Sequence, residues 1–259
     1  MIPSRDGPLV HAAAPDHVLR TLDDGLLTAD ERDRCGRLRS SADRDARVAA
    51  HLLVRWSAAQ LTGQAIETLE LVQRCPQCGS SDHGRPSMPA LPGVHVSLAH
   101  TRGAVAAAVG WDPVGVDVET ARSGDALDAA LLHLTLTERE MLQVRSSPEP
   151  RATFLRHWTL KECLVKVGAA TLDGLSRLEI DLSTAHRTAE GRTWTTYRNL
   201  HLLEWCDPGL GAVIGAAGAA PPVVDTFPVT SSQAETGTES RWGWTAVRAG
   251  RLVTAGGRR

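Results

Sequence analysis

The sequence predicts an α+β fold built from two similar α/β halves that meet near residue 112. Helical patterns and alternating strand patterns follow one another in the same order in each half. A short Ala/Gly-rich stretch occurs in both, as GAVAAAVG at 103–110 and GAVIGAAG at 211–218, each on a predicted strand. Because such strands can match by chance, the shared order of helices and strands supports the two halves as much as the repeat does.

The first half is predicted to begin with helices and to end in a β-hairpin. Residues 28–62 have a helical pattern, and Thr28 followed by Glu31 is typical of a capping box at a helix start. Residues 75–93 are rich in Cys, Pro, Gly and Ser, which predicts a loop. The alternating stretch VHVSLAH and the Ala/Gly-rich stretch after it predict two strands joined by a turn around 101–103.

The second half is predicted to open with a short strand, VGVDVE, which follows a turn at Asp112 and Pro113. Residues 126–144 and 151–168 have helical patterns, and Gly168 is typical of a helix end. Within the first of these stretches, Thr137 followed by Glu140 marks a possible helix start. The stretches LSRLEIDLS, TWTTYRNLHLLEW and GAVIGAAG predict the remaining strands.

The two halves correspond to residues 1–112 and 113–222. A change of composition then marks a polar tail at 223–259, which is rich in Pro, Ser and Thr and predicts a flexible segment. The net charge of −2 argues against a globally basic nucleic-acid binder. No apolar run is long enough for a membrane span, and the N-terminus lacks the apolar core of a signal peptide. We therefore expect a cytoplasmic protein whose five cysteines are reduced.

Two carboxylates in the VGVDVE strand are the first candidate functional feature. Asp117 and Glu119 are two residues apart, so they point to the same face of a strand, while Val116 and Val118 point to the other. Two like charges held together repel unless a cation or protons lie between them. Mg²⁺, which prefers oxygen ligands, fits such a pair, and a solvated strand face is the alternative.

A helical stretch, WTLKECLVKVG, supplies the second feature. Trp158, Glu162 and Lys166 lie one turn apart from each other and share one helix face. Glu162 and Lys166 can form an ordinary surface ion pair, which contributes little. Alternatively, Glu162 completes a site of three carboxylates and Lys166 binds a phosphate.

Basic and imidazole side chains form a third feature. Arginines are frequent early in the chain, at Arg32, Arg34, Arg37, Arg39, Arg44, Arg47 and Arg55, and Arg85 follows in a Gly-Arg-Pro sequence. Helical arginines usually lie on a solvated face, but several on one face can neutralise a ligand with several phosphates. His100, at the end of a predicted strand, is either a polar turn residue or a further ligand-binding group.

In their order and spacing these motifs resemble those of the Sfp-type 4′-phosphopantetheinyl transferases, over about residues 25–220. That family carries G-[VI]-D-[VI]-E and, further along the chain, W-x-x-K-E-x-x-x-K, which match Gly115–Glu119 and Trp158–Lys166 here. Its basic-Pro element matches Gly84–Pro86, and its strand end, S-H-S or similar, matches Ala99–Thr101. Ala99 stands where many members have Ser, so any hydroxyl contact there is lost.

The resemblance implies transfer of the 4′-phosphopantetheine arm of coenzyme A to a serine of an apo acyl or peptidyl carrier protein, with release of 3′,5′-ADP. It implies service to polyketide or nonribosomal peptide synthesis, and a monomer with the site in the cleft between halves related by a pseudo-twofold axis. The metal ligands that it implies for Mg²⁺ are Asp117, Glu119 and Glu162, and the catalytic residues are Glu162, Lys166 and Asp117. Contacts with coenzyme A are implied for Arg34, Arg85, His100, Thr101, Lys161 and Lys166.

Two other interpretations stay open at this point. Cys75 and Cys78 form half of a structural zinc site, which Cys35 or His83 would have to complete. A zinc-loop regulatory protein, or a relative that binds coenzyme A without transferring it, are the non-catalytic alternatives. The sequence names neither the carrier protein nor the preference for coenzyme A over acyl-coenzyme A.

Overall fold

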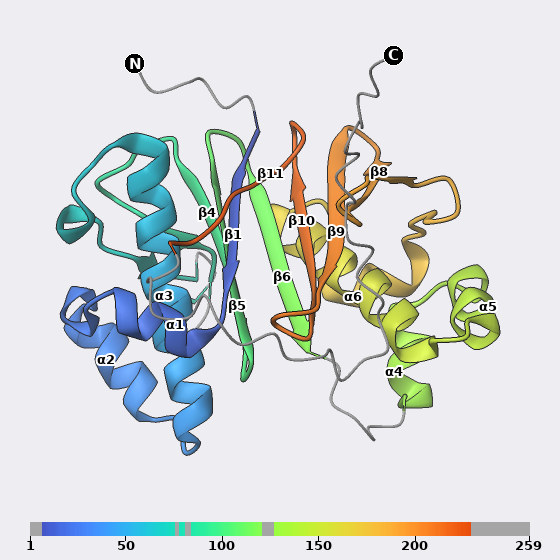
Figure 1. Ribbon diagram of the computed structural model, residues 1–259, viewed down its shortest axis with the longest axis horizontal. Helices are drawn as coiled ribbons and strands as arrows, with labels where there is room; N and C mark the ends of the chain where they lie inside the picture. The colour runs from blue at the N-terminus through green and yellow to red at the C-terminus, as the bar shows by residue number, and fades with distance from the viewer. Residues whose placement is uncertain (1–6, 76–77, 81–83, 121–126, 229–259) are drawn as a thin grey trace, which may run out of the picture.

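The protein forms two α/β halves that lie side by side (Figure 1). The structure, a computed structural model, describes residues 7–75, 78–80, 84–120 and 127–228. Its helices and strands confirm the mixed α and β composition that the sequence predicts. Within the described part of the chain, no helix is both long and apolar enough to cross a membrane.

Each half contains one main sheet. The first sheet has the order β11-β1-β5-β4 and consists of β1 (Leu9–Ala13), β4 (His95–Thr101), β5 (Ala104–Gly110) and β11 (Val223–Val224). The second has the order β6-β10-β9-β8-β7 and consists of β6 (Val114–Thr120), β7 (His186–Arg187), β8 (Thr193–Tyr197), β9 (Leu200–Asp207) and β10 (Ala212–Gly218). A small separate pair joins β2 (Val72–Gln73) to β3 (Pro86–Ser87).

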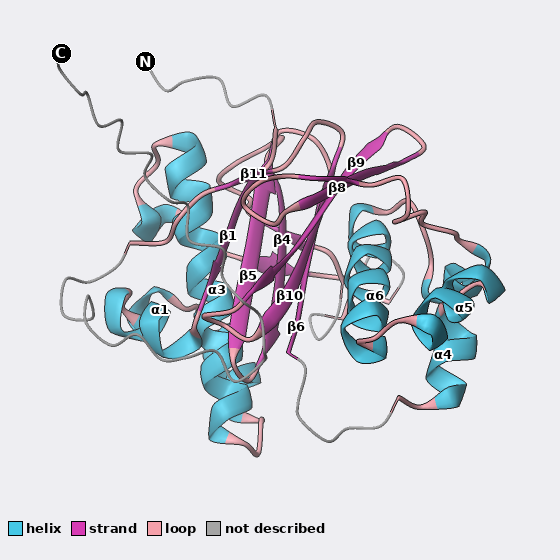
Figure 2. Ribbon diagram, turned by 45° about the vertical axis from the view of Figure 1, so that its right-hand side comes forward, coloured by secondary structure: helices cyan, strands magenta, loops and turns pink. Residues whose placement is uncertain are grey.

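Helices lie on the outer side of each sheet, so that the two sheets lie between them (Figure 2). The first half carries α1 (Pro15–Thr21), α2 (Ala29–Gly36) and α3 (Ser41–Thr62), with short 3₁₀ turns η1 (Asp24–Leu26) and η2 (Ile66–Thr68). The second carries α4 (Ala129–Thr135), α5 (Glu138–Ser146), α6 (Pro150–Val167) and η3 (Leu172–Arg177). Helix α3 packs on β4 and β5, and α6 packs on β6 and β10.

The inner faces of the two sheets share one hydrophobic core. Alanines of β5 and valines of β6 lie in the same buried cluster, together with Val10 from β1 and Ile214 from β10. The alanines have short side chains, which lets the strands of the two halves approach closely. A hydrogen bond of 3.1 Å from the Val116 N–H to the Ser97 hydroxyl also links β6 to β4.

Local sequence signals set several helix ends. Thr28 and Glu31 form the predicted capping box at the start of α2. Gly168 ends α6 in the left-handed conformation, with φ of 89°. The predicted helical stretch at 126–144 is divided into α4 and α5, because Thr137 and Glu140 form a second capping box that starts a new helix.

The strand predicted over LSRLEIDLS is wrong. Its first residues belong to η3, and the rest of the stretch forms no strand. The carbonyl of Leu175 accepts a hydrogen bond from Lys161, and the Ile180 N–H donates one to Glu140. Two backbone groups that would pair with a neighbouring strand are thus hydrogen-bonded to buried side chains instead.

The start of the predicted flexible tail is also corrected. The Val223 N–H donates to the Pro8 carbonyl at 2.7 Å, and the Asp225 N–H donates to the Val10 carbonyl at 2.9 Å, so this segment extends the first sheet. Phe227 is buried, and its ring lies 4.9 Å from that of Trp56. Residues 229–259 lie outside the described part of the chain.

Each half holds a buried carboxylate that is paired with a cation. Glu31 contacts Arg55 at 2.5 Å and His51 at 2.7 Å, and Glu140 contacts Lys161 at 2.5 Å. Burial alone would raise the pKa of either carboxyl. Hydrogen bonds outweigh this effect and hold both pKa values at about 2. The donors are His51 and Arg55 for Glu31, and His157 and Lys161 for Glu140.

These two carboxylates predict a loss of stability in acid. In the unfolded chain they take up protons near pH 4.5, but in the folded chain only near pH 2, so their stabilisation is complete above pH 4.5 and is lost as the pH falls toward 2. Each shift corresponds to about 3 kcal/mol. Urea denaturation at several pH values should show this fall. Glu31→Gln should be less stable at pH 7 and have a shallower acid slope, whereas the exposed control Glu67→Gln should keep the wild-type slope. Parallel slopes for all three proteins would contradict the assignment.

Candidate functional site

A cavity of about 500 Å³ lies where β4, β6 and the C-terminal half of α6 meet. It therefore sits between the two halves, with walls from both of them. The charged and imidazole side chains in its lining are Arg85, His100, Asp117, Glu119 and Lys166. All five were singled out from the sequence, although they lie far apart along the chain.

Helix α6 can lie directly on the strands because two glycines face it. A Cβ atom on Gly115 would lie 2.1 Å from the Cys163 carbonyl oxygen, a distance that no side chain can occupy. A Cβ atom on Gly215, which is the cross-strand partner of Asp117, would lie 3.2 Å from Thr159. The glycine of the GVDVE motif is thus required by close packing of backbone on backbone.

The two acidic residues of β6 point toward α6 and the cavity. Val116 and Val118, which alternate with them, are buried in the core shared by the two sheets. Asp117 Oδ1 lies 2.7 Å from Lys166 Nζ, which also donates to the Val116 carbonyl at 2.9 Å. The second oxygen of Asp117, Oδ2, is buried and has no hydrogen-bond partner among the described residues.

The charges of the cavity wall depend on each other. Burial lowers the pKa of Lys166, but the Asp117 carboxylate outweighs burial and raises this pKa above its usual range. Burial raises the pKa of Glu119 to about 7, and the negative charges of Asp117 and Glu162 contribute to that rise. The pKa of Glu162 is also raised, first by burial and then by Asp117. The carboxylates of Asp117, Glu119 and Glu162 are therefore close enough for electrostatic repulsion.

This donor set fits a hard divalent cation. Asp117 Oδ2 lacks a partner among the described residues, and the negative charges of Asp117 and Glu162 add to the effect of burial on the pKa of Glu119, so a cation would relieve both. Trp158 fixes Glu119 by donating its indole N–H at 3.1 Å. Within the described part of the chain, no three acidic, His or Cys side chains are already gathered as a metal-binding group, and Glu162 does not line the cavity.

The opposite wall of the cavity is basic. Partial desolvation and the positive charge of Arg47, followed by those of His51 and Lys166, lower the pKa of His100 to about 4. Arg44 and Arg47 on α3 each have a buried Nε atom with no hydrogen-bond partner in the described structure. Neither of them lines the cavity, and only Arg47 acts on His100, which the helical pattern alone could not show because the direction of each arginine depends on how α3 packs.

Arg85 connects the first half to the end of α6. Its guanidinium donates to the Lys166 carbonyl at 3.0 Å. A Cβ atom on Gly168 would lie 2.6 Å from this guanidinium, so the glycine leaves room for it. Arg85 thus compensates a free carbonyl at the helix C-terminus, beside the cavity.

Three predicted coenzyme A contacts do not line the cavity. Lys161 is fully buried on another side of α6, where it is bonded to Glu140 and two carbonyl groups. Arg34 is largely buried and donates to the Asp30 carbonyl. The Thr101 hydroxyl bonds to that of Thr120, at 3.1 Å. Motif spacing could not anticipate the positions of Lys161 and Thr101, because their partners come from other elements of the chain.

The zinc interpretation gains no support from the described residues. Cys75 is buried and Cys78 is exposed, and Cys35 lies in the buried part of α2. No group of three potential zinc ligands occurs in the described structure, while His83 lies outside it.

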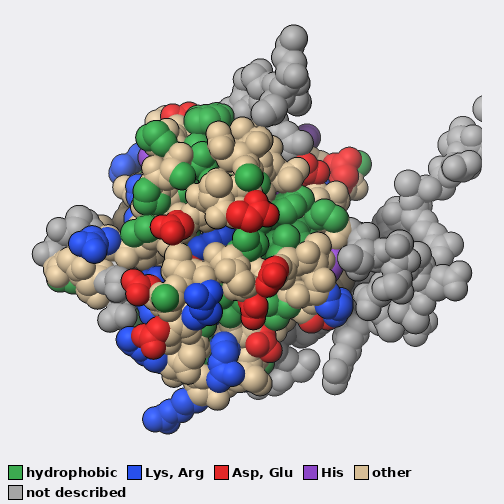
Figure 3. Space-filling view, turned by 90° about the vertical axis from the view of Figure 1, so that its left-hand side faces the viewer, with side chains coloured by type: hydrophobic (Ala, Val, Ile, Leu, Met, Phe, Trp, Pro, Cys, Tyr) green, Lys and Arg blue, Asp and Glu red, His purple; other side chains and the backbone are tan. Residues whose placement is uncertain are grey.

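The outer face of the first half carries acidic, basic and apolar side chains side by side (Figure 3), unlike the basic stripe of a nucleic-acid binder.

Comparison with known proteins confirms the resemblance that the motifs indicated. Residues 113–207 match the family described as the 4′-phosphopantetheinyl transferase superfamily. A 4′-phosphopantetheinyl transferase of Bacillus subtilis is 26% identical over 140 residues, which cover 54% of this chain and 59% of that protein. The 4′-phosphopantetheinyl transferase Sfp of Bacillus subtilis strain 168 is 23% identical over 141 residues, with the same coverage. A Bacillus pumilus 4′-phosphopantetheinyl transferase is 31% identical over 104 residues, 39% of this chain and 43% of that protein. The matched region thus spans about three fifths of the two Bacillus subtilis relatives, and these relatives are named as transferase enzymes.

The contact between β6 and α6 predicts a strong effect of a single methyl group. Gly115→Ala should lower the free energy of unfolding by about 1–3 kcal/mol or more, because the new Cβ must push the α6 backbone away. Chemical denaturation measures this loss. Gly36→Ala is the control, since a Cβ there meets no atom within 4 Å. Equal stability of the two variants would show that the close approach is absent.

Proposed function

We propose that this chain is a Mg²⁺-dependent 4′-phosphopantetheinyl transferase, which moves the phosphopantetheine arm of coenzyme A to a serine of an apo carrier protein and releases 3′,5′-ADP. The carrying observation is that acidic Asp117 and Glu119, cationic Lys166, and basic Arg85 and His100 line one cavity between the two halves. One end of this cavity suits a cation and the other a phosphate. The motif resemblance and the named relatives support the same reaction.

The metal ligands proposed are Asp117, Glu119 and Glu162, and coenzyme A is the substrate. Mg²⁺ bound there would supply charge neutralisation for the diphosphate of coenzyme A. Lys166, held beside Asp117 and cationic at neutral pH, stabilises negative charge on a phosphate at the same place. Glu162, whose pKa is raised, is suited to accept the proton of the attacking serine hydroxyl, directly or through a water molecule.

The proposal also includes a pseudo-twofold relation between residues 1–112 and 113–222, with the site in the cleft between them. Its support is the matching topology of the halves. The strand order β1-β5-β4 with helix α3 corresponds to β6-β10-β9 with helix α6. The repeated stretches become the corresponding strands β5 and β10. Because one chain contains both halves, it needs no second copy to form the cleft, and we therefore propose a monomer. The proposal also places the protein in the cytoplasm.

The proposed carriers are acyl or peptidyl carrier proteins of polyketide or nonribosomal peptide synthesis. The direct test is to incubate the protein with Mg²⁺, a fluorescent coenzyme A analogue and several apo carrier proteins of these two classes. Label on the serine of at least one carrier, abolished by EDTA, is the expected result. Label that resists EDTA, or no label on any of the carriers, would refute the proposed reaction.

Asp117→Asn tests the acidic side of the cavity. The change keeps the side-chain shape but removes a charge, and we expect transfer to fall by roughly 100-fold or more, as on removal of one preorganised charge-stabilising group. Initial rates at fixed Mg²⁺ measure the loss, and circular dichroism checks the fold. Asp16→Asn is the matched control, because Asp16 forms an exposed ion pair on α1. A normal rate for Asp117→Asn would exclude Asp117 from the reaction.

His100→Ala tests the basic side of the cavity, where the motif resemblance implies a contact with the 3′-phosphate of coenzyme A. Loss of one hydrogen bond to a charged group should lower kcat/KM for coenzyme A by roughly 10- to 100-fold. The value for 3′-dephospho-coenzyme A should change little, because that substrate lacks the phosphate. An equal fall for both substrates would place His100 elsewhere on the ligand.

A further inference from the structure

A buried ion pair lies behind the proposed site, on another side of the same helix. Lys161 directly precedes Glu162 on α6 but is fully buried and does not line the cavity. Its ammonium donates to the Thr135 carbonyl at 2.7 Å, the Leu175 carbonyl at 2.9 Å and Glu140 Oε2 at 2.5 Å. A single positive charge thus binds the end of α4, η3 and α5 to α6.

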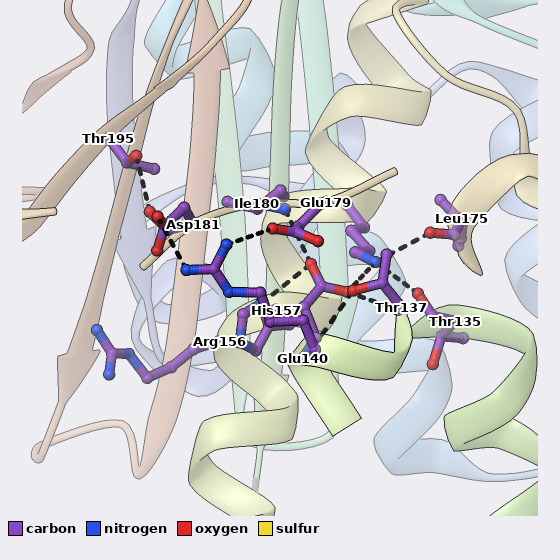
Figure 4. Close-up of polar contacts among 12 residues, drawn as sticks. Thr135, Thr137, Glu140, Arg156, His157, Leu175, Glu179, Ile180, Asp181 and Thr195 are labelled. Atoms are coloured by element: carbon purple, nitrogen blue, oxygen red, sulfur yellow. Dashed lines mark hydrogen bonds and ion pairs between the residues drawn. The ribbon is translucent and has the colours of Figure 1, made fainter. Parts of the chain in front are cut away.

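Both carboxylate oxygens of Glu140, the partner of this lysine, also accept hydrogen bonds from the backbone. Its Oε2 accepts from the Thr137 N–H at 2.8 Å, and its Oε1 accepts from the Ile180 N–H at 2.9 Å. The close-up in Figure 4 shows Thr135, Thr137, Leu175 and Ile180 arranged around Glu140. The end of α4, the start of α5, the segment of Leu175 and Ile180, and α6 therefore meet at one point, which we call the Glu140–Lys161 cluster.

Helix α6 is fixed on two sides as a result. On one side its backbone rests on Gly115 and Gly215, and on another it is bonded to the Glu140–Lys161 cluster. Successive residues of a helix are about 100° apart around the axis and 1.5 Å apart along it. Any rotation or slide of α6 that followed loss of the cluster would therefore displace Glu162 and Lys166 together, relative to Asp117 on β6.

We propose that Lys161 is a positioning residue, whose bonds to three segments fix the rotation and height of α6 so that Glu162 and Lys166 face Asp117. This inference rests on the proposed function, because Glu162, Lys166 and Asp117 need to be aligned only if they form the proposed site. It also gives the lysine of the W-x-x-K-E-x-x-x-K motif a role without contact to coenzyme A. The lysine acts through the helix that carries its neighbours.

A purely structural role is the competing explanation, and the first half supplies a matched control. Arg55 and Glu31 form a buried ion pair whose two side chains are both 0% exposed, and it lies on α3 and α2, away from α6. Removing one partner of either pair should lower stability strongly and to a similar extent, because it leaves a buried charge without its partner. Only a positioning residue should also change how the carboxylates bind a divalent cation.

The experiment compares Lys161→Met with Arg55→Met at a temperature at which circular dichroism shows both variants folded. For Lys161→Met, the Mg²⁺ concentration for half-maximal transfer should rise by about 10- to 100-fold, the usual effect of removing a group that orients metal ligands. The Mn²⁺ dissociation constant, measured by electron paramagnetic resonance with coenzyme A present, should rise by a similar factor. Arg55→Met should leave both values at the wild-type level.

A double variant separates stability from alignment. Glu140→Leu combined with Lys161→Met replaces the ion pair by apolar side chains, which should restore much of the lost stability. Without bonds to the Thr135 and Leu175 carbonyls, it should keep the raised Mg²⁺ requirement. A wild-type Mg²⁺ requirement in Lys161→Met or in the double variant would overturn the inference, as would an equal rise in Arg55→Met.

Failure of the proposed function would be recognised separately. If the wild-type protein labels no carrier, the transferase proposal fails, whatever the variants do. The Mn²⁺ titration does not depend on transfer and still decides whether Lys161 aligns the carboxylates. Unchanged Mn²⁺ affinity in Lys161→Met would then refute its positioning role, and a loss confined to this variant would support it.

Discussion

The direct contact of α6 with β6 is the constraint on which the candidate site depends. Gly115 lets the backbone of the helix come so close to the strand that a single methyl group would not fit between them. At this separation Lys166 reaches Asp117 and the Val116 carbonyl, and Trp158 reaches Glu119. Acidic groups from the strand and side chains from the helix thus face each other because the residues between them are small.

Electrostatics then decides the character of the cavity. In its acidic wall, burial and then the neighbouring charge of Asp117 raise the pKa of Glu119 to about 7, and one Asp117 oxygen has no hydrogen-bond partner among the described residues. Its basic wall, around His100 and Arg47, belongs to the other half of the molecule. The cavity between the halves therefore has acidic side chains from one half and basic side chains from the other, which is the arrangement that the proposed function uses.

The buried charges outside the cavity hold the elements that carry the site. Glu31 and Glu140 are each the third residue of a helix, where they complete a capping box, and each also accepts a hydrogen bond from a buried cation. Burying an ion pair is costly unless all its hydrogen bonds are made, and each carboxylate here has several partners. The same residue thus ends a loop, starts a helix and joins that helix to a longer one.

Local patterns in the sequence determined the capping boxes, the end of α6 at Gly168, the hairpin strands and the alternation that separates Asp117 from Val116, because each depends only on near neighbours. The motifs also identified all of the charged side chains that line the cavity. The strand expected over LSRLEIDLS and the length of the flexible tail were wrong, because Lys161, Glu140 and β1 compete for those backbone groups from far along the chain. Only the tertiary structure turned Lys161 away from the cavity and brought Arg47 toward His100, since the side of a helix that faces a ligand is decided by what the helix packs against.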